Sequence, residues 1–444
     1  MAQERRNWLL ASVLPNQGEI EGATPEWRAP MLRAARKTKP EVAGKFAVVA
    51  LAFYTFFKMF YIFNEGVAQP ADIMLAALAL LIASPTLVLS FLKKQKALLL
   101  LLIWIAIVNF TWALITNKTN MAIPVSYYVF NVIVVITAYA VRSSSPLLFD
   151  KYMIIALRLS IIVQFIFVLI DPNFRPLGTF QNPNQLAYWG IVVLSIYLVI
   201  RRNESYWSDM PFLIIVTYCV VASLSRAGAA AAILMLAAWF WLILRTQFRR
   251  LVGVVFGFML VIGAYQTGYI DRFLQQSTTA EDFERRQGGN ASSLAEERNY
   301  DRITEFYQYT ILGAGEGFNA RWEPSTVVAI EIHSSFGTML FSYGIVGLLL
   351  FCSFLYRVIR ALPLSLGLYL LPSLVYGITH QGLRFSFFWV LIGIMIALGE
   401  QLDYRKTSKP VARTPAAATV LGTRVPRGPE QLRGLASDTP SRVR

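Results

Sequence analysis

Long apolar runs separated by short polar segments extend from about residue 46 to residue 398. Most runs approach the ~20 residues that an α-helix needs to cross roughly 30 Å of hydrocarbon. The pattern predicts about twelve spans, at residues 46–63, 73–92, 98–115, 125–141, 153–170, 186–200, 211–224, 227–244, 251–265, 336–358, 365–379 and 386–398. The runs 211–224 and 365–379 are short for a full crossing. We therefore expect an all-α integral membrane protein.

Composition supports this fold class. Of the 444 residues, 56% are hydrophobic and 15% are charged, a balance too apolar for a soluble globular protein. We expect three parts: a basic cytoplasmic N-terminal extension (1–43), a membrane domain (44–400) and a disordered basic cytoplasmic tail (401–444) rich in Pro, Ala, Arg and Ser. The net charge of +15 fits cytoplasmic loops and tails facing anionic lipid, so nucleic acid is not an expected partner. The two cysteines indicate neither a disulfide framework nor a metal cluster.

Basic residues mark one side of the predicted membrane domain. Short cytoplasmic loops retain Lys and Arg, and alternate segments of this chain are basic: the N-terminal extension, 93–96, 142–151, 201–202, 245–250, 357–360 and the tail. The short intervening segments 64–70 and 116–121 contain Lys118 as their single basic residue. Both termini are therefore predicted to be cytoplasmic, and the predicted outer segments are 171–185, 223–227, 267–335 and 380–384.

The segment 267–335, between the ninth and tenth predicted spans, is too long for a simple connection and predicts a small extracytoplasmic subdomain. Apolar residues recur at helical spacing at Tyr300, Ile303, Tyr307 and Ile311, which predicts a helix within this subdomain. Arg298 and Arg302 are four residues apart and would share another face of that helix.

The stretch Gly313–Phe318 is superficially similar to a phosphate-cradling loop. Phe318 occupies the third-glycine position and no strand precedes it, so we expect a flexible turn that lets the backbone approach a substrate.

Two arginines fall on the predicted outer side. Arg226 lies between two spans with almost no loop, where an arginine is unfavourable unless it is paired or faces a polar cavity. Its small neighbours Ala227 and Gly228 would permit a close backbone approach and leave the guanidinium available for a bidentate anion contact. Arg175 begins a loop rich in Gly, Asn and Pro, and the alternative explanation for it is a contact with lipid headgroups.

His333 is one of two histidines and lies just before a span, with Glu331 close enough to orient the ring or raise its basicity. A single histidine is more often structural than catalytic. Its position on the same predicted side as the arginines nevertheless favours a general base. His380 and Arg384, in the last outer turn, are secondary candidates, and a structural role is the main alternative for both.

The order of these motifs resembles that of a known family. The motifs are Arg175–Ala187, Ser225–Gly228, a large outer loop with arginines and Gly313–Phe318, and a histidine ahead of Ser342–Leu348. Together they are similar to the O-antigen ligase and polymerase superfamily, over about residues 152–350. Each motif is short, and their combination in this order is the specific feature. Members of the family often have Asn directly after the histidine, whereas this chain has Ser334.

The resemblance implies a glycosyltransferase of the bacterial inner membrane, with its active site on the periplasmic face and a glycan on undecaprenyl diphosphate as donor. Arg226 with Arg298 or Arg302 would bind the diphosphate leaving group, and Arg175 would contact the cavity or the headgroup. His333 would take the proton from the acceptor hydroxyl as that oxygen attacks and inverts the anomeric carbon. No metal or other cofactor is expected, because a diphosphate held by arginines is already a good leaving group.

Several functions stay open at this point. A polymerase would join lipid-linked repeat units of O-antigen or exopolysaccharide, whereas a ligase would transfer the finished chain to lipid A core, and we favour the polymerase. A transporter or flippase of lipid-linked sugars is less expected, because the motifs are not repeated in two halves of the chain. A structural or chain-length-regulating protein would not explain the outer arginines and histidine. A chain-length regulator and a flippase are candidate partners.

Overall fold

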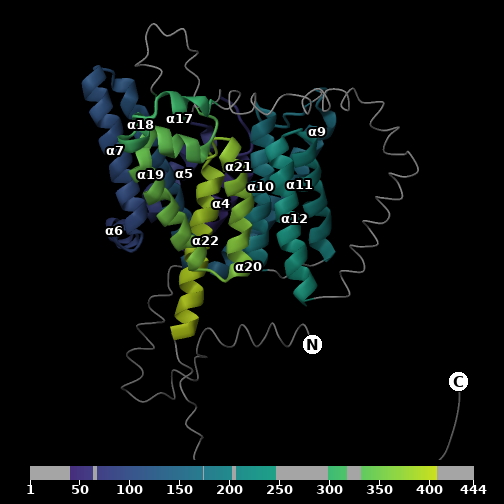
Figure 1. Ribbon diagram of the computed structural model, residues 1–444. Coiled ribbons are helices and arrows are strands. Elements are labelled where there is room, and N and C mark those ends of the chain that lie inside the picture. Colours follow the sequence, from purple (N-terminus) through teal and green to yellow (C-terminus); the bar gives the residue numbers. More distant parts are fainter. Residues whose placement is uncertain are drawn as a thin grey trace, which may run out of the picture. The chain divides into compact units, whose positions relative to one another are not determined.

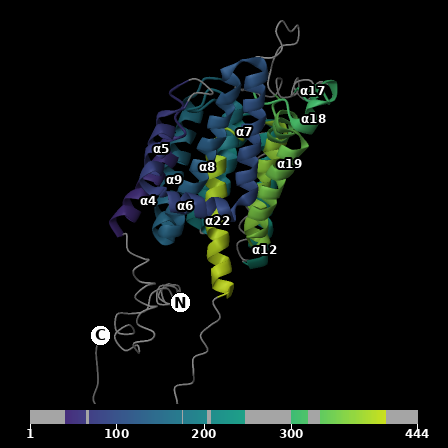
Figure 2. The same ribbon diagram turned by 90° about the vertical axis from the view of Figure 1, so that its left-hand side faces the viewer.

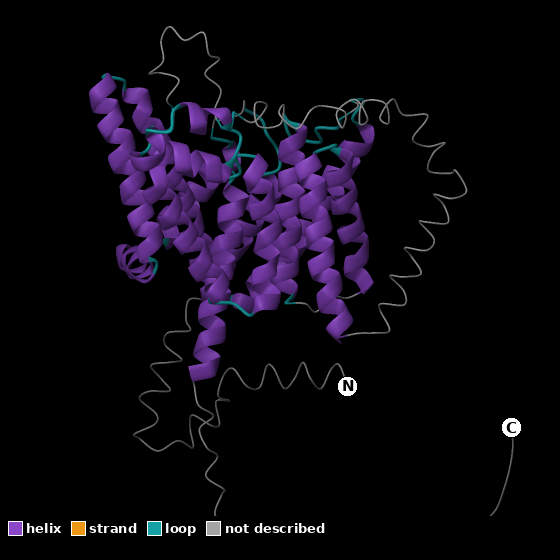
Figure 3. Cartoon of the chain, viewed as in Figure 1, coloured by secondary structure: helices purple, strands orange, loops and turns teal. Residues whose placement is uncertain are grey.

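The computed structural model describes residues 41–63, 68–173, 175–202, 207–246, 299–317 and 332–407. Every regular element in these ranges is a helix, and they contain no strand (Figure 3). The predicted extension 1–43 and tail 401–444 fall almost entirely outside these ranges, so both stay predictions. The same holds for most of the predicted outer segment 267–335.

From α4 to α12 and from α19 to α22, the helices follow one another with short connections (Figure 1). In chain order they are α4 (Glu41–Phe57), α5 (Pro70–Ile82), α6 (Pro85–Lys94), α7 (Lys96–Thr116), η1 (Thr119–Ala122), α8 (Ile123–Ser144), α9 (Pro146–Ile170), α10 (Pro183–Arg201), η2 (Trp207–Asp209), α11 (Met210–Ala222), α12 (Arg226–Thr246), α17 (Asp301–Glu305), α18 (Tyr309–Leu312), α19 (Ser335–Arg360), α20 (Leu364–Gly367), η4 (Leu368–Leu370), α21 (Leu371–Thr379) and α22 (Ser386–Thr407).

Six helical segments of the described ranges are long and apolar enough to cross a membrane, and a bent pair, α5 with α6, would make seven. The six are Lys96–Thr116, Thr119–Ser144, Pro146–Ile170, Pro183–Arg201, Ser335–Arg360 and Ser386–Asp403. Shorter apolar helices are Gly44–Phe57, Met210–Ala222, Arg226–Trp241 and Leu364–Thr379. These helices agree with an all-α integral membrane protein. The expected number of about twelve spans stays a prediction, and the run 251–265 lies outside the described ranges.

Two helices lie at the centre of the bundle. Of the most apolar stretch of each helix, 83% of the residues are buried in α10 and 78% in α22, compared with 28% in α7. The helices at the periphery of the bundle expose large apolar side chains, including Leu80, Leu114, Ile170 and Ile233. Apolar surface of this extent is unfavourable in water and fits a hydrocarbon environment. Figure 2 shows α4 packed beside α5 and α9 at one edge, and α18 beside α19 at the other.

One end of the bundle collects the loops that follow α4, α9, α11 and α21, and we call it the outer end (Figure 1). Hydrogen bonds join these loops to one another. The Thr179 hydroxyl donates to the carbonyl of Met59 over 2.6 Å, and Arg175 Nε donates to the carbonyl of Ser223 over 3.0 Å. Every predicted outer segment that the structure describes thus lies at the same end.

The opposite end, which we call the inner end, carries ion pairs between helices. Two carboxylates, on Asp209 and Glu400, accept hydrogen bonds there from Arg158, Arg201, Lys94 and Tyr139. Lys and Arg at this end agree with the distribution that the positive-inside rule predicts for cytoplasmic loops. The orientation in the membrane stays a prediction.

The run 73–92, expected as one span, is broken. Helices α5 and α6 meet at an angle of 99°. Pro85 has no backbone N–H to continue the hydrogen-bond ladder of α5, and the Ser84 hydroxyl instead accepts a hydrogen bond from Leu87 N as the N-cap of α6. Proline and an N-capping serine are therefore the local cause of the bend.

Helix α19 contains a second break, at Gly344, whose φ and ψ are 66° and −176°. The break frees carbonyl groups of the preceding turn, which need other donors because they are buried. Ala314 N and Gly315 N donate to the carbonyls of Phe341 and Ser342, both over 2.8 Å. The segment 313–317 is therefore hydrogen-bonded to the broken span, in contrast to the flexible turn expected from its glycines.

Candidate active site

The loop after α9 is ordered by Asp171. Its carboxylate accepts hydrogen bonds from Leu177 N at 2.6 Å and Asn173 N at 3.0 Å. Partial burial opposes ionisation, but the hydrogen bonds from Asn173 and Leu177 outweigh it and lower the pKa of the Asp171 carboxyl below its usual value. The loop that presents Arg175 is thereby held in one shape.

Arg175 joins segments of the outer end by hydrogen bonds. Beyond its bond to the carbonyl of Ser223, its guanidinium donates to Asn184 Oδ1 at 3.3 Å. The side chain is partly buried and joins the loop after α9 to the start of α10 and to the turn after α11. Arg175 therefore connects three segments of the outer end. The headgroup or cavity contact expected from the sequence stays a prediction.

The turn before Arg226 is strained and closely packed. Leu224 has φ of 53°, a conformation that a side chain with a Cβ rarely adopts. Ser225 Oγ accepts a hydrogen bond from Gly228 N at 3.2 Å, which caps the start of α12. A Cβ on Gly228 would lie 2.9 Å from Ala187 Cβ, so the glycine permits α12 to approach α10. Local strain of this kind is concentrated at functional sites.

Arg226 is the first residue of α12 and is exposed at the outer end. Its guanidinium makes no hydrogen bond or ion pair with another described residue. The positive end of the α12 dipole lies at the same place, so the local potential favours an anion there. Arg226 is therefore available to a ligand, whereas Arg175 is occupied by contacts within the protein.

His333 is exposed and lies two residues ahead of α19. The next residue, Ser334, is the N-cap of α19, and its hydroxyl accepts a hydrogen bond from Gly337 N at 2.9 Å. Asn and Ser are both strong N-capping residues. The serine found where the family often has asparagine therefore has a physical explanation: either residue can begin the helix that follows the histidine.

The turn after α21 encloses Ser335. The Ser335 hydroxyl donates to the carbonyl of His380 at 3.1 Å and accepts from Gly382 N at 2.9 Å. The His380 ring stacks on Tyr376, with ring centroids 4.4 Å apart, and its Nδ1 lies 3.1 Å from Thr379 Oγ1. His380 thus lies beside the start of α19, close in the fold to the segment that carries His333.

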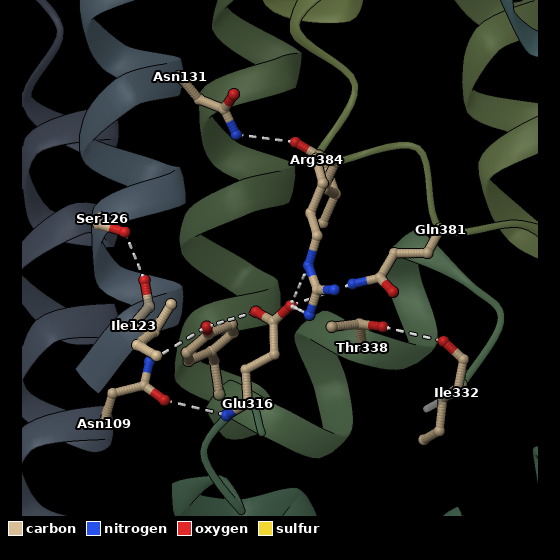
Figure 4. A network of polar contacts seen from close by, with 11 residues as sticks. Asn109, Ile123, Ser126, Asn131, Glu316, Ile332, Thr338, Gln381 and Arg384 are labelled. Carbon is tan, nitrogen blue, oxygen red and sulfur yellow. Dashed lines mark hydrogen bonds and ion pairs between the residues drawn. The ribbon is translucent and has the colours of Figure 1, made fainter. Parts of the chain in front are cut away.

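Glu316 is a buried carboxylate at the centre of a polar network (Figure 4). Its Oε1 accepts from Arg384 Nε at 2.9 Å, from the terminal guanidinium nitrogen of Arg384, and from Gln381 Nε2 at 3.2 Å. Its Oε2 accepts from the Tyr343 hydroxyl at 2.7 Å. Glu316 N donates to Asn109 Oδ1 at 3.0 Å. One residue of the glycine-rich segment therefore contacts α7, α19 and the turn after α21.

Arg302 lies on α17 and is buried. The hydroxyl of Tyr300, just before α17, donates to the carbonyl of Ile378, so this short helix lies against the end of α21. The single helix expected over 300–311 is divided into α17 and α18, because Phe306–Gln308 form a turn between them. Arg298 and Glu331 lie outside the described ranges, and their roles stay predictions.

A chain of contacts connects two of the predicted site residues, Arg175 and His380. Arg175 bonds Asn184, whose carbonyl accepts from the Tyr376 hydroxyl at 2.7 Å, and Tyr376 stacks on His380. Helix α12, which begins with Arg226, packs against α21. Glu316 is not among the residues that the sequence motifs indicate. A carboxylate within an apolar, glycine-rich segment was the available signal, since such a group needs a cation when it is buried.

Within the described ranges, no group of three or more His, Cys, Asp or Glu side chains has the arrangement of a metal site. The described residues thus define a helical membrane protein whose outer end combines exposed Arg226 and His333 with a buried carboxylate network.

A family model described as O-antigen ligase matches residues 211–352. This match supports the resemblance over a segment that includes Arg226 and His333. A search of curated proteins gives no match.

Proposed function

We propose that the protein is a periplasmic-face glycosyltransferase that polymerises oligosaccharide repeat units carried on undecaprenyl diphosphate. The product would be a surface polysaccharide, either O-antigen or exopolysaccharide. The observation that carries the proposal is the family match over a segment that contains both exposed candidates. Arg226 begins α12, and His333 lies two residues ahead of α19 at the same end of the bundle.

The proposed reaction is a single displacement that needs no metal. His333 takes the proton of an acceptor hydroxyl, and the oxygen forms a bond to the anomeric carbon of the donor sugar. The bond from that carbon to the diphosphate oxygen breaks, and the configuration inverts. Negative charge grows on the leaving diphosphate, and Arg226, with Arg302 or Arg298, stabilises it.

Ligation is the second candidate function. The matching family model is itself described as O-antigen ligase, and a ligase would use the same donor and the same leaving group. The two functions differ in the acceptor, which is a lipid-linked repeat unit for a polymerase and lipid A core for a ligase. Transport of lipid-linked sugars is a weaker candidate, because it gives no role to a general base.

The experiment that tests the proposal is the glycan profile of cells that lack the protein, by gel electrophoresis and mass spectrometry. We expect single repeat units on undecaprenyl diphosphate to accumulate, and complementation with the wild-type gene to restore long chains. Long chains on the carrier with none on lipid A would instead identify a ligase. Lipid-linked glycans retained on the cytoplasmic side of the membrane would indicate a transporter and contradict both.

Replacing Arg226 with alanine is expected to lower glycan transfer by about 10²–10³-fold, as removal of a group that stabilises developing charge does. Arg226→Lys should recover only part of the loss, because lysine supplies a point charge without the bidentate fork. Stability should change little, since the side chain is exposed. The measurement is the transfer rate of purified protein in vesicles containing the lipid-linked donor.

Arg357→Ala is a matched control for Arg226, because Arg357 is also exposed and lies on α19 toward the inner end. It should transfer glycan at the wild-type rate. Equal losses in the two variants would show that the Arg226 effect is not specific to the proposed site.

A further inference from the structure

The Glu316 carboxylate accepts hydrogen bonds from side chains of two different elements. Tyr343 belongs to α19, which begins just after His333, and Gln381 and Arg384 belong to the turn after α21. Figure 4 shows the side chains of Gln381 and Arg384 directed toward the carboxylate of Glu316. The side chain of Glu316 is 3% exposed, so its contacts are with the protein.

The turn after α21 in turn fixes the residues that follow His333. Ser335 N and Ser335 Oγ both donate to the carbonyl of His380 over 3.1 Å, and Gly382 N donates to Ser335 Oγ over 2.9 Å. Because Gln381 and Arg384 lie on the same turn, a shift of the turn would move Ser335. Hydrogen bonds at both ends of this turn, joined by its backbone, therefore connect Glu316 to a residue two positions after His333.

The geometry argues against Glu316 as the proton acceptor itself. Both of its carboxylate oxygens already accept hydrogen bonds, from Arg384 and Gln381 on one side and from Tyr343 on the other. A buried ion pair is weak evidence for stability, since apolar residues of similar volume often serve as well. Such a network gives instead a defined arrangement of the elements that it joins.

We propose that Glu316 is a positioning residue for His333: through Arg384 and Gln381 it fixes the turn after α21, and that turn fixes the start of α19 beside the histidine. This inference rests on the proposed function, in which His333 removes the proton of the acceptor hydroxyl. Displacement of a reacting group by about 1 Å can lower a rate about 10²-fold. Loss of the Glu316 contacts should therefore slow the chemical step.

The test compares full-length wild type, Glu316→Gln, His333→Ala and the double variant in vesicles. The donor is lipid-linked glycan extracted from cells that lack the protein. For Glu316→Gln we expect kcat per folded molecule to fall about 10²-fold while KM for the donor changes less than about threefold. The double variant should be no slower than His333→Ala, because a positioning residue has no effect once the group that it positions is absent.

Asp209→Asn is the matched control. Asp209 is 2% exposed in its side chain and accepts hydrogen bonds from two arginines and a tyrosine, so its environment is similar, but it lies at the inner end. Glu316→Gln leaves Arg384 without its counter-charge, so Glu316→Gln/Arg384→Gln, which removes both charges, is measured as well. It should stay folded and show the same fall in kcat as Glu316→Gln.

Three outcomes would overturn the inference. The first is a wild-type kcat in folded Glu316→Gln and in Glu316→Gln/Arg384→Gln. The second is a loss of kcat in Asp209→Asn equal to that in Glu316→Gln. The third is a further loss of kcat when Glu316→Gln is added to His333→Ala. Failure of the proposed function has a different signature. In that case the wild-type protein transfers no glycan, or His333→Ala is as active as wild type.

Discussion

His333→Ala is expected to lower glycan transfer by about 10²–10⁴-fold, the range that a positioned general base contributes. The protein should stay folded, because the side chain is exposed and the N-cap of α19 is the neighbouring Ser334, which is unchanged. Binding of the donor should be nearly unaffected, so the loss should appear in kcat. The measurement is the initial rate in vesicles at saturating donor, together with the thermal unfolding of each variant.

The chain has only two histidines, so His380 provides the critical comparison. His380→Phe keeps an aromatic ring to stack on Tyr376, and it keeps the backbone carbonyl that binds Ser335. Its loss of activity should be much smaller than that of His333→Ala. A larger loss in His380→Phe would transfer the role of base to His380, and normal activity in both variants would exclude histidine as the base.

The class of fold was accessible from the sequence because the signal is repeated along the chain. Apolar runs near the length of a membrane crossing predict helices whatever their neighbours are. The breaks within helices were less accessible. Pro85 with Ser84 is a recognisable stop and start signal for α5 and α6. Gly344 carried no such signal, since glycine is common in membrane helices and its φ depends on the segment packed against it.

The sequence indicates exposed Arg226 and His333, and also Arg302 and Arg384, but it does not indicate the buried carboxylate of Glu316. Arg226 stands out because an arginine between two apolar spans with almost no loop is unfavourable unless it is paired or faces a polar cavity. His333 stands out because it is one of two histidines. Glu316 is recognisable only with its partners, which are 27, 65 and 68 residues away in the chain. Pairings over such separations follow from tertiary packing. Reading Gly313–Phe318 as a flexible turn was reasonable from composition, but it overlooked the partners that a buried carboxylate requires.

Gly344→Ala is expected to lower the free energy of unfolding by about 3 kcal/mol or more, and it is the largest structural effect that we predict. The dihedral angles of Gly344 lie in a region that only glycine adopts readily. A Cβ there would also lie 2.2 Å from the carbonyl oxygen of Ile311. That contact is with backbone, which cannot rotate away as a side chain can. The measurement is thermal unfolding of the solubilised protein, followed by the recovery of folded material on size exclusion.

Gly317→Ala separates the cost of the backbone conformation from the cost of the clash between an added Cβ and its neighbours. Gly317 also has positive φ, 78°, but the nearest atoms to an added Cβ are 3.9 Å away, on Met121 and Pro124. This variant should therefore show only the conformational penalty, about 1 kcal/mol. Equal effects would mean that packing against Ile311 contributes nothing to the break. A much larger effect at Gly344 would show that the break exists because the chain at 311–315 occupies its place, which also sets the position of Glu316.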